Sequence, residues 1–258
     1  MADRRMAIVT GASAGIGRAI APALGALGWA VAVGARRVDR LEEAAAEIDA
    51  AGGEAFARHL DVTDASSIDA FVDAAEGALG PVDVLVNNAG MAVPGELHRA
   101  RVDDLRHEVA TNLLGPMLMS RRAIASMVDR GTGGDLVFIS SDATRNARPR
   151  MATYSATKAG VELLSRSLSM ELEGTGIRST TVRIGPTLSE FGFGWDQAQL
   201  EDLMTFWPRY GLQRHAGVLD AAAVARAVVF AVTAPAGMHL DTIEVQPEAP
   251  RTQRATPP

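Results

Sequence analysis

The sequence of 258 residues contains no cysteine, and this absence excludes several kinds of site. Without a thiol the chain forms no disulfide, no thiolate metal site and no cysteine nucleophile. Its histidines also fall at no spacing typical of metal ligands; they are His59, His98, His107, His215 and His239. We therefore expect no metal ion in the functional site.

The chain also lacks an excess of positive charge and any long apolar run. Its formal net charge is −6, and its basic residues are scattered along the sequence. A nucleic acid or an anionic membrane attracts clustered positive charge, so we expect neither as a partner. No apolar run approaches membrane-spanning length, and the first residues lack the apolar segment of a signal peptide. These features predict a cytoplasmic protein that binds small molecules.

Apolar residues make up 47% of the chain and charged residues 22%, which is enough for one sizeable core. Short apolar runs alternate with segments of helical periodicity, a pattern that implies right-handed crossovers and a parallel sheet. The expected strands are 6–10, 29–35, 55–60, 82–86, 135–140, 178–184 and 242–245. The expected helices are 19–27, 39–51, 65–79, 102–128, 153–172 and 221–232.

The alternation predicts an α/β fold: a single doubly wound Rossmann-type domain with about seven parallel strands and helices on both faces. We expect this domain to span residues 1–246. Residues 247–258 are rich in proline and polar side chains, so we expect a flexible C-terminal tail.

A glycine-rich turn joins the first expected strand to its helix. The residues that we expect to bind a cofactor there are Gly11, Ser13, Gly15, Ile16 and Gly17. Glycines let backbone N–H groups approach a pyrophosphate, and the helix N-terminus offers unpaired donors. The turn therefore favours a dinucleotide ligand. A plain strand-to-helix turn is the alternative, because the spacing G-x-x-x-G-x-G differs from G-x-G-x-x-G.

Arg36 and Arg37 follow the second expected strand, at the place where an acidic residue would bond the ribose of NAD. A guanidinium group suits the additional 2′-phosphate of NADP, because its planar fork binds phosphate oxygens in pairs. The two arginines therefore predict NADP as the cofactor. The alternative is an exposed pair that opens the next helix.

Polar clusters follow four further strands, where parallel sheets bind their ligands. The cofactor-binding candidates among them are Asp61, Val62, Asn88, Ala89, Gly90, Gly185 and Thr187, and Ser141 follows the fifth strand. Each residue alone could serve as a turn former or helix cap. Their shared edge of the sheet predicts one cleft.

Tyr154 and Lys158 stand four residues apart in an expected helix, so their side chains share one helix face. A nearby cation favours the phenolate and brings a tyrosine towards acid–base chemistry near neutral pH. The alternative is an exposed pair without function.

Aromatic residues make up only 5% of the chain, yet several gather in residues 189–217, which we call the lid segment. They are Phe191, Phe193, Trp195, Phe206, Trp207 and Tyr210. We interpret the lid segment as a mobile lid or a wall of the substrate pocket, with core filling as the alternative. A basic loop, residues 145–150, could instead meet an anionic substrate or remain solvated.

Taken together, these motifs resemble the classical short-chain dehydrogenase/reductase family, and the resemblance covers residues 5–246. It rests on the glycine turn, on Asn87-Asn88-Ala89-Gly90, on Asn112, on Ser141 thirteen residues before Tyr154, and on Tyr154-x-x-x-Lys158. The resemblance implies catalytic roles for Asn112, Ser141, Tyr154 and Lys158. Ser141 would bond the substrate oxygen, Tyr154 would move the proton, Lys158 would assist Tyr154 and hold the nicotinamide ribose, and Asn112 would position a water molecule.

The family resemblance implies an NADP(H)-dependent oxidoreductase that acts on a carbonyl or alcohol substrate, which we expect to be mainly apolar. It also implies a homotetramer, because the helices expected at 102–128 and 153–172 pair across a two-fold axis in that family. The alternatives are a 3-oxoacyl thioester reductase, a broad-specificity alcohol dehydrogenase, and a regulatory protein that binds a dinucleotide without catalysis.

Overall fold

The computed structural model describes residues 4–212 and 215–250, so residues 251–258 of the expected tail and 213–214 of the lid segment lie outside the described residues. Its sheet has seven parallel strands in the order β3-β2-β1-β4-β5-β6-β7. The strands are β1 (Met6–Thr10), β2 (Ala30–Ala35), β3 (Glu54–His59), β4 (Val84–Asn87), β5 (Gly134–Ser141), β6 (Ile177–Ile184) and β7 (Thr242–Val245). The predicted α/β class and doubly wound sheet are confirmed.

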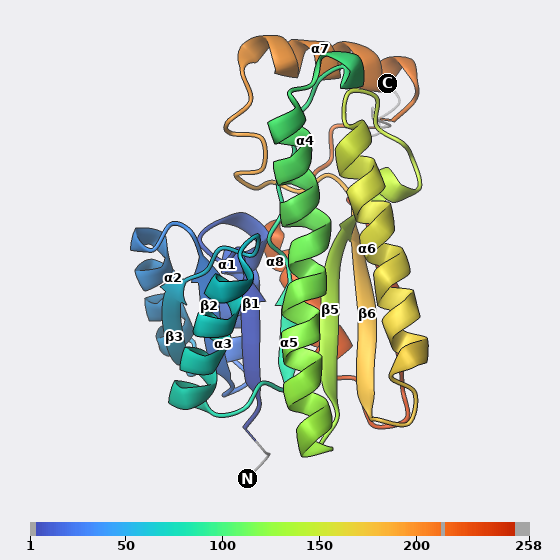
Figure 1. Ribbon diagram of the computed structural model, residues 1–258. Coiled ribbons are helices and arrows are strands. Elements are labelled where there is room, and N and C mark those ends of the chain that lie inside the picture. The colour runs from blue at the N-terminus through green and yellow to red at the C-terminus, as the bar shows by residue number, and fades with distance from the viewer. Residues whose placement is uncertain (1–3, 213–214, 251–258) are drawn as a thin grey trace, which may run out of the picture.

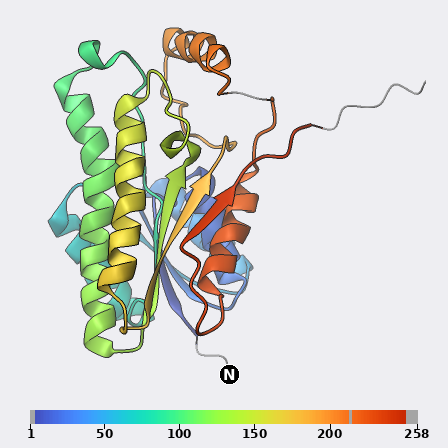
Figure 2. The ribbon, with the colours of Figure 1, turned by 90° about the vertical axis from the view of Figure 1, so that its right-hand side faces the viewer.

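Helices cover both faces of the sheet (Figures 1 and 2). On one face lie α1 (Gly15–Gly25), α2 (Asp39–Ala50) and α8 (Ala221–Val232). On the other lie α3 (Ala65–Leu79), α4 (Val102–Val109), α5 (Gly115–Arg130) and α6 (Ala152–Glu171). A further helix, α7 (Gln197–Arg209), lies across the end of the molecule towards which the strands run (Figure 1).

Alternating side chains of each strand build the two halves of the core. Ala7 and Val9 of β1 pack in the same cluster as Leu24 of α1, whereas Ile8 packs with Phe71 of α3 on the opposite face. All five are nearly inaccessible to solvent. Burying a large aliphatic or aromatic side chain contributes about 1.5 to 3 kcal/mol, so the sheet is stabilised from both sides.

The helix expected at 102–128 is interrupted. A π-helical turn, η2 (Ala110–Leu114), separates α4 from α5. The apolar spacing continues on both sides of this wider turn, so periodicity alone does not reveal it. Such turns occur frequently at functional sites, and Asn112 lies in the middle of this one.

The lid segment is more regular than the sequence analysis expected, because it contains α7. A capping box starts this helix: Asp196 accepts a hydrogen bond from the backbone N–H of Gln199 (2.8 Å), and the Gln199 side chain accepts one from the backbone of Asp196 (2.9 Å). Leu203 anchors the helix by its burial. Within residues 4–212 and 215–250, no helix combines the length and hydropathy needed to cross a membrane.

Candidate active site

A cavity of about 670 Å³ lies where the strands end, between the sheet and the lid segment. The predicted site residues that line it are Gly11, Ser13, Gly15, Ile16, Arg36, Arg37, Asp61, Val62, Asn88, Ala89, Gly90, Ser141, Tyr154, Lys158, Gly185 and Thr187. Gly17 and Asn112 lie behind this wall. The structure therefore brings residues from many separate segments of the chain into one site.

The glycine turn is shaped by two residues in the left-handed region, Gly11 (φ 67°) and Gly15 (φ 56°). A Cβ atom on Gly11 would lie 2.8 Å from the Cα of Ala89, and one on Gly17 would lie 2.5 Å from Nδ2 of Asn88. Only glycine permits this close approach of the turn to the residues after β4. The contact fixes the first strand end against the fourth.

The N-terminus of α1 is suited to an anion. Its first turn carries no acidic residue, and Ala14 at the N-cap gives it no side-chain hydrogen bond. Gly15 and Ile16 of this turn line the cavity. Backbone N–H groups at a helix N-terminus, together with the helix dipole, favour a phosphate at this position.

Arg36 and Arg37 point to different neighbours. Nη1 of Arg36 lies 3.3 Å from Nε2 of His107. Burial opposes ionisation of Asp61, but hydrogen bonds from Thr63 and the charge of Arg36 together hold the pKa of that carboxyl below its ordinary value. Arg36 and Asp61 therefore lie close together as opposite charges beside the end of β3.

Arg37 lies nearer to the glycine turn. It donates hydrogen bonds to Oγ of Ser13 from Nη2 (3.1 Å) and Nε (3.3 Å). Its Nη1 pairs with Glu190 of the lid segment at 3.0 Å, and Arg40 pairs with the other oxygen of Glu190. Sequence reasoning missed Glu190, since no periodic or motif signal marks it.

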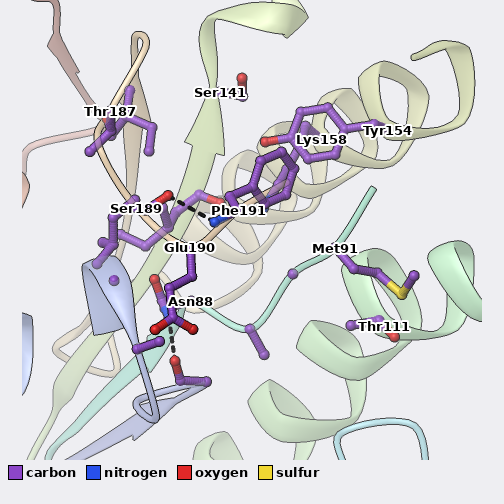
Figure 3. A pocket seen from close by; sticks show the side chains of 18 of the residues that line it. Asn88, Met91, Thr111, Ser141, Tyr154, Lys158, Thr187, Ser189, Glu190 and Phe191 are labelled. Atoms are coloured by element: carbon purple, nitrogen blue, oxygen red, sulfur yellow. Dashed lines mark hydrogen bonds between the residues drawn. The ribbon is translucent and has the colours of Figure 1, made fainter. Parts of the chain in front are cut away.

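The side chains of Ser141 at the end of β5 and Tyr154 of α6 lie next to each other in the cavity wall, and Lys158 lies behind the tyrosine ring (Figure 3). Nζ of Lys158 is 5.8 Å from the centre of this ring and donates a hydrogen bond to the carbonyl oxygen of Ile139 at 2.8 Å. The spacing of four residues thus places the phenol and the amine on one helix face, as expected.

The protonation of this pair differs from the expectation. Burial raises the pKa of Tyr154 to about 12, while hydrogen bonding with Ser141 works in the opposite direction. Burial also lowers the pKa of Lys158 to about 8. The predicted lowering of the tyrosine pKa by the lysine is therefore wrong for this structure, because desolvation dominates and the amine is directed at Ile139.

Asn112 is fully buried and holds the loop that follows β4. Its Oδ1 accepts a hydrogen bond from the backbone N–H of Met91 (2.8 Å), and its Nδ2 donates to the carbonyl oxygen of Met91 (2.7 Å). Nδ2 also donates to Oγ1 of Thr157 at 3.2 Å. A Cβ atom on Gly90 would lie 3.5 Å from both Asn112 Oδ1 and Lys158 Nζ, so these three residues are close neighbours.

The lid segment closes the cavity with aromatic rings. The ring of Phe191 lies 5.3 Å from that of Tyr154 and 5.6 Å from that of Trp195. Trp195 donates from Nε1 to the carbonyl oxygen of Ala92 at 2.9 Å, which ties the lid segment to the loop after β4. The aromatic residues of the lid segment that line the cavity are Phe191, Phe193, Trp195 and Trp207.

The arginines of the basic loop hold the lid segment. Arg148 is buried, donates to Asp142 at 2.6 Å and to the carbonyl oxygen of Leu212 at 2.9 Å, and lies over the ring of Trp207. Arg150 pairs with Asp202 of α7. The alternative of a solvated loop is therefore wrong for these two arginines, since both are held in ion pairs and little exposed.

Asp142 and Arg148 line the cavity beside Ser141. Sequence reasoning missed Asp142, and it gave Arg148 only as a member of the basic loop. Burial raises the pKa of Asp142, although the charge of Arg148 acts against this effect. Throughout residues 4–212 and 215–250, no group of three or more histidine, aspartate or glutamate side chains could hold a metal ion.

Comparisons with known proteins agree with this arrangement. A family model described as short chain dehydrogenase matches residues 5–199. Sulfoacetaldehyde reductase 2 of Chromohalobacter salexigens is 30% identical over 244 residues, which cover 93% of this chain and 93% of that protein. Glycine betaine reductase ATRR of Emericella nidulans is 35% identical over 244 residues; these cover 94% of this chain but only 19% of that much longer protein.

Among solved structures, an alcohol dehydrogenase from the archaeon Thermococcus sibiricus, complexed with 5-hydroxy-NADP, is similar to this chain. Its TM-score is 0.82 at 29% sequence identity, and the match covers 97% of this chain and 100% of that one.

Proposed function

Because this chain belongs to the short-chain dehydrogenase/reductase family, we propose that it is an NADP(H)-dependent oxidoreductase acting on a carbonyl or alcohol group. The observation that carries the proposal is the convergence of Ser141, Tyr154 and Lys158 with the glycine turn on one cavity. A dinucleotide site and a proton-transfer site in one cavity serve one reaction.

The residues present fit a dinucleotide. The uncapped N-terminus of α1 lines the cavity with Gly15 and Ile16, and Arg37 lies beside this turn through its hydrogen bond to Ser13. We assign cofactor binding to the predicted cofactor residues that line the cavity. Gly17 lies behind them and keeps the glycine turn compact. When bound, NADPH would supply the hydride.

Ser141 and Tyr154 are the proposed hydrogen-bond donors to the substrate oxygen. A phenol with a pKa of about 12 is protonated at neutral pH, so Tyr154 is ready to donate a proton during carbonyl reduction. Ser141 would stabilise the negative charge that develops on the same oxygen. In the direction of alcohol oxidation Tyr154 would act as the base.

Lys158 and Asn112 are the proposed supporting residues. The Lys158 amine lies next to Gly90 at the cavity wall, where it can bond a ribose hydroxyl. The Asn112 side chain positions Met91 and Thr157 through its hydrogen bonds. Its predicted role in holding a water molecule for proton transfer stays a prediction.

The proposed substrate is a mainly apolar aldehyde or ketone. Four aromatic rings of the lid segment line the cavity beside Tyr154. Arg148 is already paired with Asp142, so it offers no free charge to an anionic substrate. A strong dependence of KM on ionic strength, lost on replacing Arg145 and Arg148, would overturn this substrate class.

A panel of aldehydes, ketones and alcohols, assayed with both nicotinamide cofactors, tests the proposal. We expect turnover with NADPH and a higher kcat/KM for NADPH than for NADH, because the 2′-phosphate adds a charge-assisted contact worth about 1.5 to 3 kcal/mol. Equal or better use of NADH by the unaltered protein would contradict the cofactor preference.

A further inference from the structure

The Glu190 carboxylate lies between two arginines at the rim of the cavity. One oxygen pairs with Nη1 of Arg37 at 3.0 Å, and the other pairs with Arg40. Hydrogen bonds from these two arginines lower the pKa of Glu190, so it is ionised at neutral pH. An acidic residue of the lid segment thus reaches the basic side chains that follow β2.

The lid segment approaches the glycine turn at the same place. A Cβ atom on Gly15 would lie 3.0 Å from Cβ of Ser189, the residue before Glu190. Ser13, Arg37, Ser189 and Glu190 all line one cavity, and Figure 3 shows Ser189 and Glu190 on the side of the cavity where Asn88 lies. Glu190 therefore occupies the part of the site that meets the strand ends of β1 and β2.

Arg37 and Arg40 cannot neutralise the Glu190 carboxylate and a phosphate group at the same time. Arg37 and Arg40 carry two positive charges, and Glu190 neutralises one of them. A phosphate monoester carries about −1.5 to −2 charges near pH 7, which the two arginines alone would balance. With Glu190 still in place the carboxylate and the phosphate would share these two arginines and repel each other. Arg36, the third guanidinium after β2, is directed at His107 and is balanced by the charge of Asp61.

We propose that Glu190 is a specificity-determining residue: its carboxylate competes with the 2′-phosphate of NADP(H) for Arg37 and Arg40 and so lowers the affinity for NADP(H) selectively over NAD(H). This inference rests on the proposed dinucleotide site. NAD(H) has no 2′-phosphate and leaves the Glu190 ion pairs undisturbed.

The competition is moderate in size. The side chain of Arg37 is 48% exposed and that of Glu190 is 33% exposed. Ion pairs this accessible to water are weak, so a phosphate can displace the carboxylate. Glu190 therefore tunes the preference between the two cofactors without blocking either.

Equilibrium binding of NADP⁺ and NAD⁺, measured by calorimetry without substrate, tests the proposal. In Glu190→Gln we expect the affinity for NADP⁺ to rise about fivefold and that for NAD⁺ to change by less than about twofold. Glu201→Gln is the matched control, because it removes the same charge from an exposed position of the lid segment and should change neither affinity. Glu190→Ala should reproduce the selective gain without the amide, and thermal unfolding verifies that each variant is folded.

An unchanged or weaker affinity of both Glu190 variants for NADP⁺ would overturn the competition, and so would an equal gain for both nucleotides. Arg37→Ala separates this failure from a failure of the proposed cofactor. If Arg37→Ala loses NADP⁺ affinity while the Glu190 variants gain none, the competition alone is wrong. If NADP⁺ binds with unchanged affinity in all of these variants, the phosphate site itself is wrong.

Discussion

The Tyr154 hydroxyl and the Lys158 amine lose most of their hydration in the same wall of the cavity. Burial raises the pKa of the phenol and lowers that of the amine to about 8, so the phenol is neutral at neutral pH while the amine is still mostly protonated. Shifted pKa values of neighbouring groups are typical of sites of proton transfer. Substitution of each residue tests its role.

Tyr154→Phe removes one oxygen and little volume. We expect the fold and NADPH binding to survive while kcat falls by roughly 10²-fold or more, because the proton donor is lost. Steady-state kinetics and NADPH fluorescence titration measure the two effects. A variant that kept most of its activity would show that another group donates the proton.

The two reaction directions should respond differently to pH. With a Tyr154 pKa of about 12, the phenol stays protonated through neutral pH and supports carbonyl reduction at a nearly constant rate. Alcohol oxidation needs the phenolate, whose fraction rises about tenfold per pH unit below the pKa, so its kcat/KM should climb between about pH 6 and 9. An oxidation rate that stays level over this range would contradict Tyr154 as the base.

Glu108 gives a prediction about stability. The residue is 2% exposed, its Oε1 has no hydrogen-bond partner among the described residues, and burial raises its pKa to about 7. The folded state therefore holds a proton that the unfolded state releases between the ordinary pKa of 4.5 and about 7, and the free energy of unfolding falls as pH rises through this window.

Glu108→Gln removes that dependence. We expect the variant to gain roughly 1 to 3 kcal/mol of unfolding free energy relative to the unaltered protein at about pH 8, and little at about pH 4. Urea unfolding at the two pH values measures the gain, and Glu171→Gln at an exposed position of α6 is the control. An equal gain at both pH values would contradict the role of ionisation.

At the residue scale, the sequence identified the polar groups that follow the strands but not those that the lid segment brings. Ser141, Tyr154 and Lys158 could be predicted from spacing and resemblance, because each stands at a fixed place relative to one strand or helix. Glu190 could not, because its position depends on contacts with Arg37 and Arg40, which lie in a distant segment of the chain. Asp142 and its ion pair with Arg148 are local, but no spacing rule marks them as buried beside Ser141. Local spacing also gave the wrong direction for the Tyr154 pKa, which burial controls.

At the scale of secondary-structure elements, the first turn of α1 packs so closely that only glycine fits at position 17. A side chain on Gly17 would collide with Asn88 and with the carbonyl oxygen of Gly11, 2.7 Å away. We expect Gly17→Ala to cost about 1 to 3 kcal/mol of stability and to weaken dinucleotide binding, because the turn must widen. Thermal unfolding and cofactor titration check both effects.

Gly77→Ala in α3 is the matched control, since a Cβ atom there would meet no described atom within 4 Å beyond its chain neighbours and the backbone of its own helix. This change should stabilise the protein by about 0.5 to 1 kcal/mol, because alanine favours the helix. If both variants gained stability, the close approach of the glycine turn to Asn88 would have no energetic importance.

Most strands could be predicted because a continuous apolar run marks a strand that is buried on both faces, and most helices because apolar residues at helical spacing mark one buried face. The helix α7 was missed although the sequence holds both its capping box, Asp196 to Gln199, and apolar residues at helical spacing, Leu200, Leu203, Met204 and Trp207. The aromatic and glycine residues around this stretch favoured an irregular lid instead. The π-helical turn at Asn112 was missed because apolar residues continue before and after it. Both elements border the cavity, where packing against other segments decides the local structure.

At the scale of the whole molecule, the homotetramer stays a prediction, and an exposed apolar helical face supports it. Large apolar side chains are exposed on the helices of one face: Val102, Val109, Leu114, Met117, Val128, Leu163 and Met170. Leu163 and Met170 of α6 are 60% and 71% exposed, and exposed apolar patches mark sites of association.

Sedimentation velocity at micromolar concentration tests the assembly. We expect the unaltered protein to sediment as a tetramer and the double variant Leu163→Glu, Met170→Glu to dissociate, because charges on the apolar face oppose its burial. The exposed pair Glu171→Gln, Glu173→Gln, close to the same end of α6, is the control. A monomeric unaltered protein would contradict the prediction.

The strand order has a consequence for how the chain is made. β1 is synthesised early, but it pairs with β2 on one side and with β4 on the other, where Ala7 lies opposite Val84. Until β4 emerges from the ribosome, the nascent sheet β3-β2-β1 presents an apolar, unpaired edge, and such edges invite association between chains. We therefore expect translation pauses that occur before β4 has emerged from the ribosome to favour aggregation, and later pauses to be tolerated.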